Sequence, residues 1–193
     1  MAFTILIWVS LSTQASLGRI DSLQAGRIDP LQYANALTAR HTVSHPKEWT
    51  LTAELLARHH PEETALSVSL LQRALENSPD DAHSWALLSF LEKKKSGAYT
   101  QDAEASLRRS FDVCPYCDRD LLRWRFTFVL DNWEAASEDS KLAAFSGADF
   151  LRWWYLDYDF LHQVREASLA RQIPFDTYRR KIDTPVRPQE IES

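Results

Sequence analysis

Two stretches of the chain decide its fold, because they are versions of one pattern: residues 49–79 read WTLTAELLARHHPEETALSVSLLQRALENSP, and residues 85–115 read WALLSFLEKKKSGAYTQDAEASLRRSFDVCP. The matched residues, 36 positions apart in each pair, are Trp49 and Trp85, Ala53 and Ser89, Ala74 and Ser110, and Pro79 and Pro115. A period near this length is typical of stacked pairs of antiparallel helices, since one pair cannot bury its apolar face alone. The repeat therefore predicts an all-α fold built as a stack of helix pairs.

Apolar residues at helical spacing support this prediction within the first unit. One stripe covers residues 49–58, and a second covers residues 66–77. Pro61 lies between them, and we expect it to open the second helix, because proline is tolerated in a first helical turn. The second unit repeats the arrangement around a turn at residues 96–97.

This arrangement resembles the tetratricopeptide repeats, a family that places a Trp early in its first helix, a small residue one turn later and a Pro after its second helix. Trp49, Ala53 and Pro79 match these positions in the first unit, and their counterparts match them in the second. The period is slightly longer than the family's, and Ala53 and Ser89 stand where the family has a glycine. The resemblance implies a stack of helix pairs that binds other proteins, and it specifies the fold more than the function.

The composition is that of a soluble globular protein: of 193 residues, 45% are hydrophobic and 25% are charged. With only four glycines, the chain lacks the material for a sheet of tight hairpins or a glycine-lined phosphate loop. Its net charge of −5 argues against a nucleic-acid partner, since such binding depends on a basic face. Two basic runs, at residues 93–95 and 179–181, are more typical of solvated helix ends.

The N-terminal stretch, residues 2–11 (AFTILIWVSL), is the most hydrophobic in the chain. It is too short to cross a bilayer as a helix, but it has the length of a signal-peptide core, although the usual positive charge before the core is missing. We therefore expect a targeting or anchor segment, with a buried segment of the fold as the alternative. The predicted organisation is an anchor at residues 1–15, a linker at 16–30, a tetratricopeptide-like helical domain at 31–182 and a tail at 183–193. The predicted location is the bacterial inner membrane or periplasm, with membrane association through residues 1–11.

A dense aromatic window follows the repeats, at residues 150–161 (FLRWWYLDYDFL). We expect it to be one helix, and two interpretations remain open: an aromatic cap that shields the last repeat, or an anchor for a partner protein, because aromatic residues dominate interface hot spots. On the second interpretation, the candidate partner-binding residues are Trp153, Trp154 and Tyr158. Asp157 and Asp159 are predicted to lie on different helix faces and are poor candidates for a paired acid and base.

The string Cys114-Pro-Tyr-Cys117 is identical to the redox-active tetrapeptide of glutaredoxins. That resemblance implies thiol–disulfide exchange, in which the first thiolate is activated at a helix N-terminus. The glutaredoxin motif follows a strand, whereas here the second helix of a repeat precedes it. Three further interpretations stay open: buried reduced thiols, a local disulfide in an oxidising compartment, or a metal site. We expect no metal or other cofactor, because there is no second Cys-x-x-Cys and the six histidines form no zinc pattern.

No serine nucleophile elbow, phosphate loop or dinucleotide fingerprint occurs in the sequence, so we assign no catalytic residues. Residues 122–126 (LRWRF) and 132–133 (NW) resemble stretches of small anchored helical-repeat proteins from bacterial exopolysaccharide and O-antigen systems. We therefore expect a non-enzymatic scaffold or adaptor at the cell envelope that docks one or more proteins of an envelope or membrane assembly. Two alternatives remain: a thiol–disulfide oxidoreductase that uses Cys114 and Cys117, and a structural subunit of a membrane complex.

Overall fold

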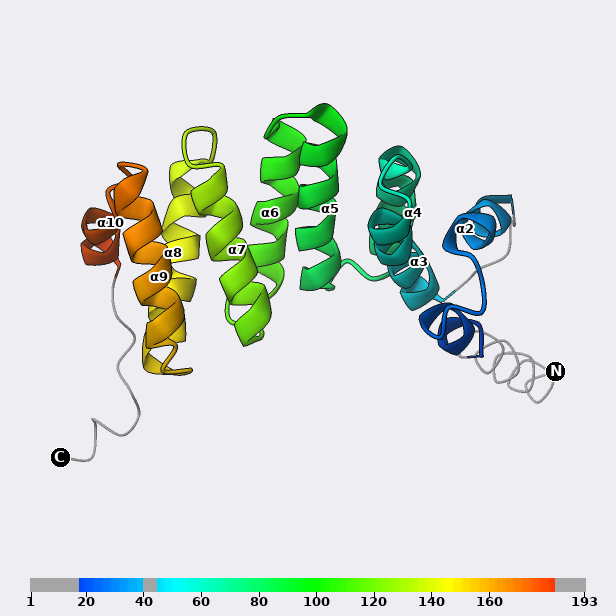
Figure 1. The fold of residues 1–193 in the computed structure, drawn as a ribbon, viewed down its shortest axis with the longest axis horizontal. Coiled ribbons are helices and arrows are strands. Elements are labelled where there is room, and N and C mark those ends of the chain that lie inside the picture. Colours follow the sequence, from blue (N-terminus) through cyan, green and yellow to red (C-terminus); the bar gives the residue numbers. More distant parts are fainter. Residues whose placement is uncertain (1–17, 40–44, 183–193) are drawn as a thin grey trace. The chain divides into compact units, whose positions relative to one another are not determined.

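The structure, a computed structural model, describes residues 18–39 and 45–182 (Figure 1). Within these two ranges the regular elements are all helices, which confirms the predicted all-α class. Residues 18–24 are helical, and the helices after them are α2 (Pro30–Ala39), α3 (Pro46–His59), α4 (Thr64–Asn77), α5 (Ala82–Ser96), α6 (Gln101–Val113), α7 (Arg119–Asp131), α8 (Glu138–Trp153), α9 (Tyr158–Ala170) and α10 (Phe175–Lys181). The predicted anchor and tail, residues 1–15 and 183–193, lie outside the described residues.

The chain divides into two compact units, Met1–Gly97 and Ala98–Ser193. The division falls in the turn between α5 and α6, inside the second predicted helix pair. The helical domain predicted for residues 31–182 is therefore shared between two units, and each is described by itself below.

In the first unit, α3 and α4 form the predicted helix hairpin, with α2 against α3 and α5 against α4 (Figure 1). Trp49, Ala53 and Leu56 of α3 are buried against Leu70 and Leu71 of α4. The helix α4 begins at Thr64, three residues later than Pro61, which lies in the turn.

The matched residues of the two repeats occupy equivalent places in their helices, but they are not all buried to the same extent. Trp49 and Trp85 are each the fourth residue of their helix. Trp49 is buried, whereas Trp85 is half-buried and its indole Nε1 donates to the Pro79 carbonyl at 2.8 Å. Ala53 and Ser89 are both fully buried. The repeat predicts equivalent buried positions for Trp49 and Trp85, and this is wrong, because the Trp85 indole turns toward Pro79, before its own helix.

The predicted linker, residues 16–30, contains a helix at residues 18–24, which corrects that assignment. Leu23 is buried in the core of the first unit. Arg19 pairs with the fully buried Glu48 of α3 at 2.8 Å, and the Tyr33 hydroxyl donates to the other Glu48 oxygen at 3.1 Å. The segment folds because it covers Glu48 and adds an apolar side chain to the core.

In the second unit, α8 is the central element and packs against α6, α7, α9 and α10 (Figure 1). Its core is aromatic: Phe145 meets Phe126 and Phe175 edge-on, both with ring centroids 5.1 Å apart. Gly147 lets α7 and α8 approach closely, since an added Cβ would lie only 3.0 Å from a methyl carbon of Leu122.

A fully buried arginine links α7 to the end of α6. Arg125 donates to the Ser110 hydroxyl at 3.0 Å and to the Cys114 carbonyl at 2.8 Å, so its guanidinium satisfies groups at the C-terminal end of that helix. Burial lowers the pKa of Arg125 to about 10, and the guanidinium remains charged at neutral pH. The small side chain of Ser110, a repeat position, makes room for it.

Candidate functional site

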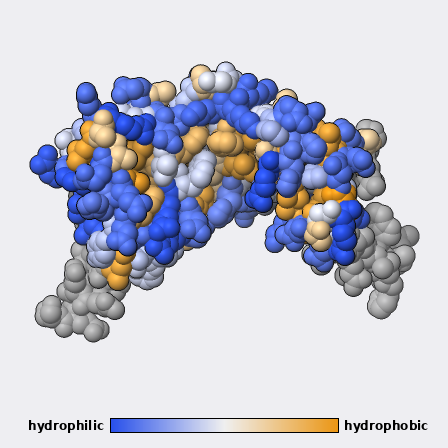
Figure 2. All heavy atoms as spheres, viewed as in Figure 1, coloured by the Kyte–Doolittle hydropathy of each residue, from blue (hydrophilic) through white to orange (hydrophobic). Residues whose placement is uncertain are grey.

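Exposed hydrophobic residues gather where α8 passes into α9. Trp154, Leu156 and Tyr158 are 57%, 54% and 56% exposed, within five consecutive residues. We call residues 154–158 the aromatic turn. Figure 2 shows hydrophobic residues at the surface of the lower end of the second unit, where Figure 1 places the α8–α9 connection. Aromatic residues left in solvent in this way are typical of interaction sites.

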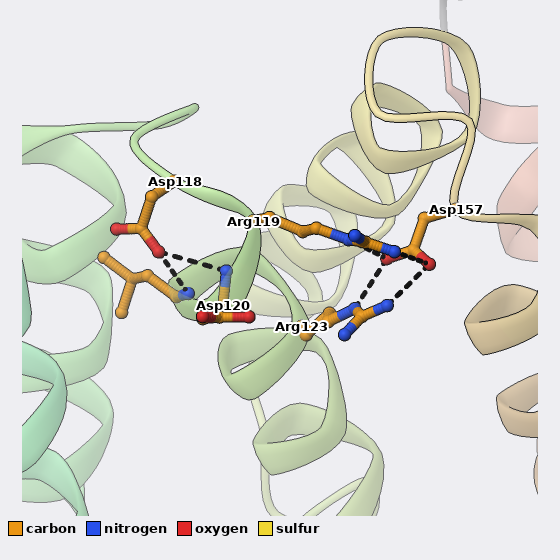
Figure 3. A network of polar contacts seen from close by, with 6 residues as sticks. Asp118, Arg119, Asp120, Arg123 and Asp157 are labelled. Carbon is orange, nitrogen blue, oxygen red and sulfur yellow. Dashed lines mark hydrogen bonds and ion pairs between the residues drawn. The ribbon is translucent and has the colours of Figure 1, made fainter.

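A buried carboxylate within the turn fixes it to α7. Asp157 has only 2% of its side chain exposed, and each of its oxygens accepts from two guanidinium groups. Arg119 donates at 3.0 and 2.7 Å, and Arg123 at 2.6 and 2.7 Å. Figure 3 shows both arginines, one helical turn apart, directed at this carboxylate. Their hydrogen bonds hold the pKa of Asp157 far below its usual range, so it is ionised at neutral pH.

The N-terminus of α7 is itself anchored, which places the arginines. Asp118 caps the helix by accepting from the backbone N–H groups of Asp120 and Leu121 at 3.0 and 2.9 Å (Figure 3). Arg119 and Arg123 therefore project from the first two turns of a well-defined helix.

The backbone of the turn is held in an uncommon conformation. Leu156 has a φ of 54°, in the left-handed region that side chains other than glycine rarely adopt. The Asp157 N–H donates to the Leu151 carbonyl at 3.0 Å, and the Trp154 N–H donates to the Phe150 carbonyl at 3.0 Å. Strained residues of this kind persist where surrounding contacts determine them, and they cluster at functional sites.

An aromatic cluster around the half-buried Phe150, near the end of α8, packs against the turn. Tyr116 and Trp154 stack on this ring, with centroids 4.7 and 5.7 Å away, and Trp153 and Tyr155 meet it edge-on at 5.2 and 5.9 Å. These geometries are the favourable ones for aromatic pairs.

A disulfide closes the loop that carries Tyr116. Cys114 and Cys117 are joined, with Cα atoms 5.5 Å apart, in the connection between α6 and α7. The structure therefore has these cysteines oxidised, which fits a local disulfide and also the oxidised form of a thiol–disulfide exchange site.

The sequence-predicted partner-binding residues separate into two environments. Trp154 and Tyr158 are exposed, whereas Trp153 is half-buried at the end of α8. The prediction of one helix over residues 150–161 is wrong, because α8 ends at Trp153 and α9 begins at Tyr158.

Sequence reasoning missed the residues that hold the turn, chiefly Asp157, Arg119 and Arg123. One signal was available: arginines four positions apart lie on the same helix face and need a counter-charge. Nothing local indicates that this charge comes from a residue more than thirty positions later. The sequence predicts only that Asp157 is a poor acid–base candidate, and its two ion pairs give it a structural role.

Other classes of site find no support in the described part of the chain. Within residues 18–39 and 45–182, no group of three or more His, Cys, Asp or Glu side chains is placed to hold a metal ion. Nor does any helix in those ranges combine the length and hydropathy that crossing a membrane requires. Comparison with protein-family models, curated proteins and solved structures finds no match to this chain.

Proposed function

We propose that this chain is a non-enzymatic binding protein and that the aromatic turn is its partner-binding surface. The observation that carries the proposal is the exposure of Trp154, Leu156 and Tyr158 on a backbone fixed by Asp157. Large aromatic side chains on a rigid frame bind with little loss of conformational freedom, which favours affinity. The partner is a protein, since the turn offers the exposed aromatic and aliphatic side chains that are typical of interface hot spots.

The capping role alone does not account for the exposed residues. A side chain whose only task is to shield the core should be largely buried, as Phe150 and Trp153 are in part. Trp154 and Tyr158 leave more than half of their surface in water. We therefore assign capping to the Phe150 cluster and binding to the aromatic turn.

We also propose that the helices belong to a tetratricopeptide-like stack. Support comes from the α3–α4 hairpin, from the matched places of Trp49 and Trp85 in their helices, and from the buried small residues Ala74 and Ser110. A stack of this kind presents side chains over several helices to one partner.

For the cellular context we propose the bacterial envelope, with a partner from a membrane assembly such as one for polysaccharide assembly or export. The supporting features are the apolar stretch at residues 2–11 and the resemblance of residues 122–126 and 132–133 to envelope-associated repeat proteins.

Deleting residues 1–15 should move the protein from the membrane fraction to the soluble fraction and leave its far-UV circular dichroism unchanged. A loss of cooperative unfolding in that variant would instead place the stretch within the fold. If detergent extracts the intact chain only in a complex with other subunits at fixed stoichiometry, the structural-subunit alternative is favoured.

The binding proposal is tested by site-specific photocrosslinking in cells. A benzophenone amino acid at position 154 or 158 should give one shared crosslinked protein. The controls are positions 90 and 169, where Phe90 and Leu169 are 41% and 43% exposed but lie outside the turn. Equal crosslinking at all four positions, or none at 154 and 158, would refute the proposed surface.

Thiol–disulfide exchange is a second candidate, favoured by one observation. Of the two joined cysteines, Cys117 lies immediately before Asp118, the N-cap of α7, where a thiolate is stabilised by the helix dipole, whereas Cys114 caps the C-terminus of α6. Reduction of an insulin disulfide by the purified protein, lost in Cys114→Ser, would favour this function over binding.

A further inference from the structure

A pocket of about 470 Å³ lies between α8, α9 and α10 of the second unit. This volume is typical of small-ligand sites, which combine apolar walls with a few well-placed polar groups. Each of the three helices contributes one arginine to the lining and at least one large apolar side chain. In the order α8, α9 and α10, the arginines are Arg152, Arg165 and Arg179, and the apolar residues are Phe145, Leu161 and Phe175.

The three arginines differ in whether a carboxylate of the protein neutralises them. Arg152 donates to Asp149 at 2.9 Å, and Arg165 donates to both oxygens of Asp176 at 3.0 and 2.7 Å. Arg179 is exposed and forms no hydrogen bond or ion pair with another described residue. One of the three guanidinium groups therefore has all of its donors available for a ligand.

The lining offers few acceptors to balance these donors. Asp149 is only 7% exposed and already pairs with Arg152. The other carboxylate of the lining, Asp159, is exposed, so water and salt screen its charge. His162, also exposed, adds a ring N–H donor. Positive charges from three helices repel one another within one pocket, and a bound anion relieves that repulsion, so the pocket has the polarity of an anion site with apolar walls.

We infer that this pocket binds a small amphipathic anion, in which an apolar body carries one carboxylate. The body packs against Phe145, Leu161 and Phe175 and removes part of their surface from water. The carboxylate binds the guanidinium of Arg179, whose planar donors match its two oxygens. One negative charge suffices, because the other two arginines already have carboxylate partners. The ligand is a free small molecule, so the inference goes beyond the proposed function, which concerns a protein partner.

The chemistry is tested with three probes: octanoate, octanamide, which has the same chain without the charge, and acetate, which has the charge without the chain. Each is titrated into the full chain, labelled with ¹⁵N, and the amide shifts of α8, α9 and α10 are followed. Octanoate should bind about tenfold more tightly than either of the others, since it alone gains from both apolar burial and charged hydrogen bonds.

Three results would overturn the inference. Equal affinity for octanoate and octanamide would show that the charge is not recognised. Equal affinity for octanoate and acetate would show that the apolar body is not recognised. An absence of shifts in the three helices at millimolar octanoate would show that the pocket does not bind this class of ligand.

A matched pair of variants on α10 assigns the charge. Arg179→Gln should weaken octanoate binding about three- to fivefold, the effect of one exposed ion pair. Arg180→Gln removes the same charge at the next position, which is exposed but does not line the pocket, and should leave the affinity unchanged. Asp159→Asn should tighten binding about twofold, because it removes the exposed carboxylate of the lining. Equal losses in the two arginine variants, or weaker binding in Asp159→Asn, would refute the site.

These measurements need no partner protein, so they can fail independently of the crosslinking test. Octanoate shifts without crosslinks at positions 154 and 158 would support the pocket and refute the proposed function. Crosslinks without octanoate shifts would support the binding surface and refute the inference about the pocket.

Discussion

The carboxylate of Asp157 accepts two hydrogen bonds from the guanidinium of Arg123, at 2.6 and 2.7 Å, across the space between α7 and the start of α9. A second arginine, Arg119, completes the coordination. This contact fixes the position of the residues on either side, Leu156 and Tyr158, whose side chains are exposed. The connection between α8 and α9 is thereby made into a defined surface.

Replacing Asp157 with Asn should destabilise the second unit. We expect the free energy of unfolding to fall by about 1–3 kcal/mol, the range for hydrogen bonds that involve charged groups. The lower part of that range is favoured because the arginines are a third to a half exposed and solvent screens their charge. Urea unfolding followed by circular dichroism measures the change. The control is Asp159→Asn at an exposed site, which should change the free energy by less than about 0.5 kcal/mol.

Acid should also destabilise this unit, because four of its described carboxylates have a lowered pKa: Glu104, Glu138, Asp157 and Asp176. Hydrogen bonds from Arg119 and Arg123 lower the pKa of Asp157. Burial alone would raise the pKa of Glu104. Its hydrogen bonds, of which the one from Ser137 has the largest effect, outweigh burial and lower the pKa. The folded state then binds protons less readily than the unfolded state. Their stabilisation is therefore complete above the unfolded pKa of about 4 and is lost as the pH falls below it.

The measurement is the urea midpoint as a function of pH. It should be level between pH 7 and pH 5 and should fall below about pH 4. In Asp157→Asn the fall should be shallower, because one of these carboxylates no longer titrates. An equally steep fall in that variant would show that Asp157 does not contribute to the acid sensitivity.

The two repeat tryptophans should differ in their contribution to stability. Trp49 is buried and its ring lies under the Arg73 guanidinium, so Trp49→Ala should cost about 3–5 kcal/mol. Trp85 is half-buried, and Trp85→Ala should cost less than about 3 kcal/mol. Thermal melts of the two variants make the comparison. A melting temperature unchanged in Trp49→Ala would contradict the placement of this side chain in the core.

Loss of either cysteine should be mildly destabilising, and only under oxidising conditions. The loop between Cys114 and Cys117 is short, so its closure contributes about 2 kcal/mol on the chain-entropy relation. Cys114→Ser and Cys117→Ser should have the same effect, and a reducing agent should bring the wild-type chain to their level. Partner capture should survive both substitutions, since the aromatic turn is held mainly by Asp157. Loss of capture in both variants would show that the disulfide loop is part of the binding surface.

The helices were predictable where the signal is local. Periodic apolar residues and prolines predict α3, α4, α5 and α6, because these features act within a few residues of one another. The helix at residues 18–24 was missed, since its support is distant: Glu48 needs Arg19 as a partner, and the core needs Leu23.

The break in the aromatic window was not predictable for the same reason. Residues 154–157 contain neither Gly nor Pro, and Leu156 reaches a positive φ without a local signal. The turn is imposed by Arg119 and Arg123, which bind Asp157 from another helix. The sequence did identify Trp154 and Tyr158 as candidates, because a dense run of aromatic residues can be seen in the sequence itself. That Trp153 is half-buried while Trp154 and Tyr158 are exposed depends on the tertiary structure.

The central claim is that Trp154 contacts a partner and does not merely complete the fold. The direct test is the affinity of Trp154→Ala for the crosslinked partner, measured together with its melting temperature. We predict that binding weakens by more than about fivefold, or 1 kcal/mol, as expected for a hot-spot residue, while the melting temperature falls by only the few degrees that loss of the stacking on Phe150 explains. Unchanged affinity, or a loss of affinity that comes with a larger fall in melting temperature, would contradict the account.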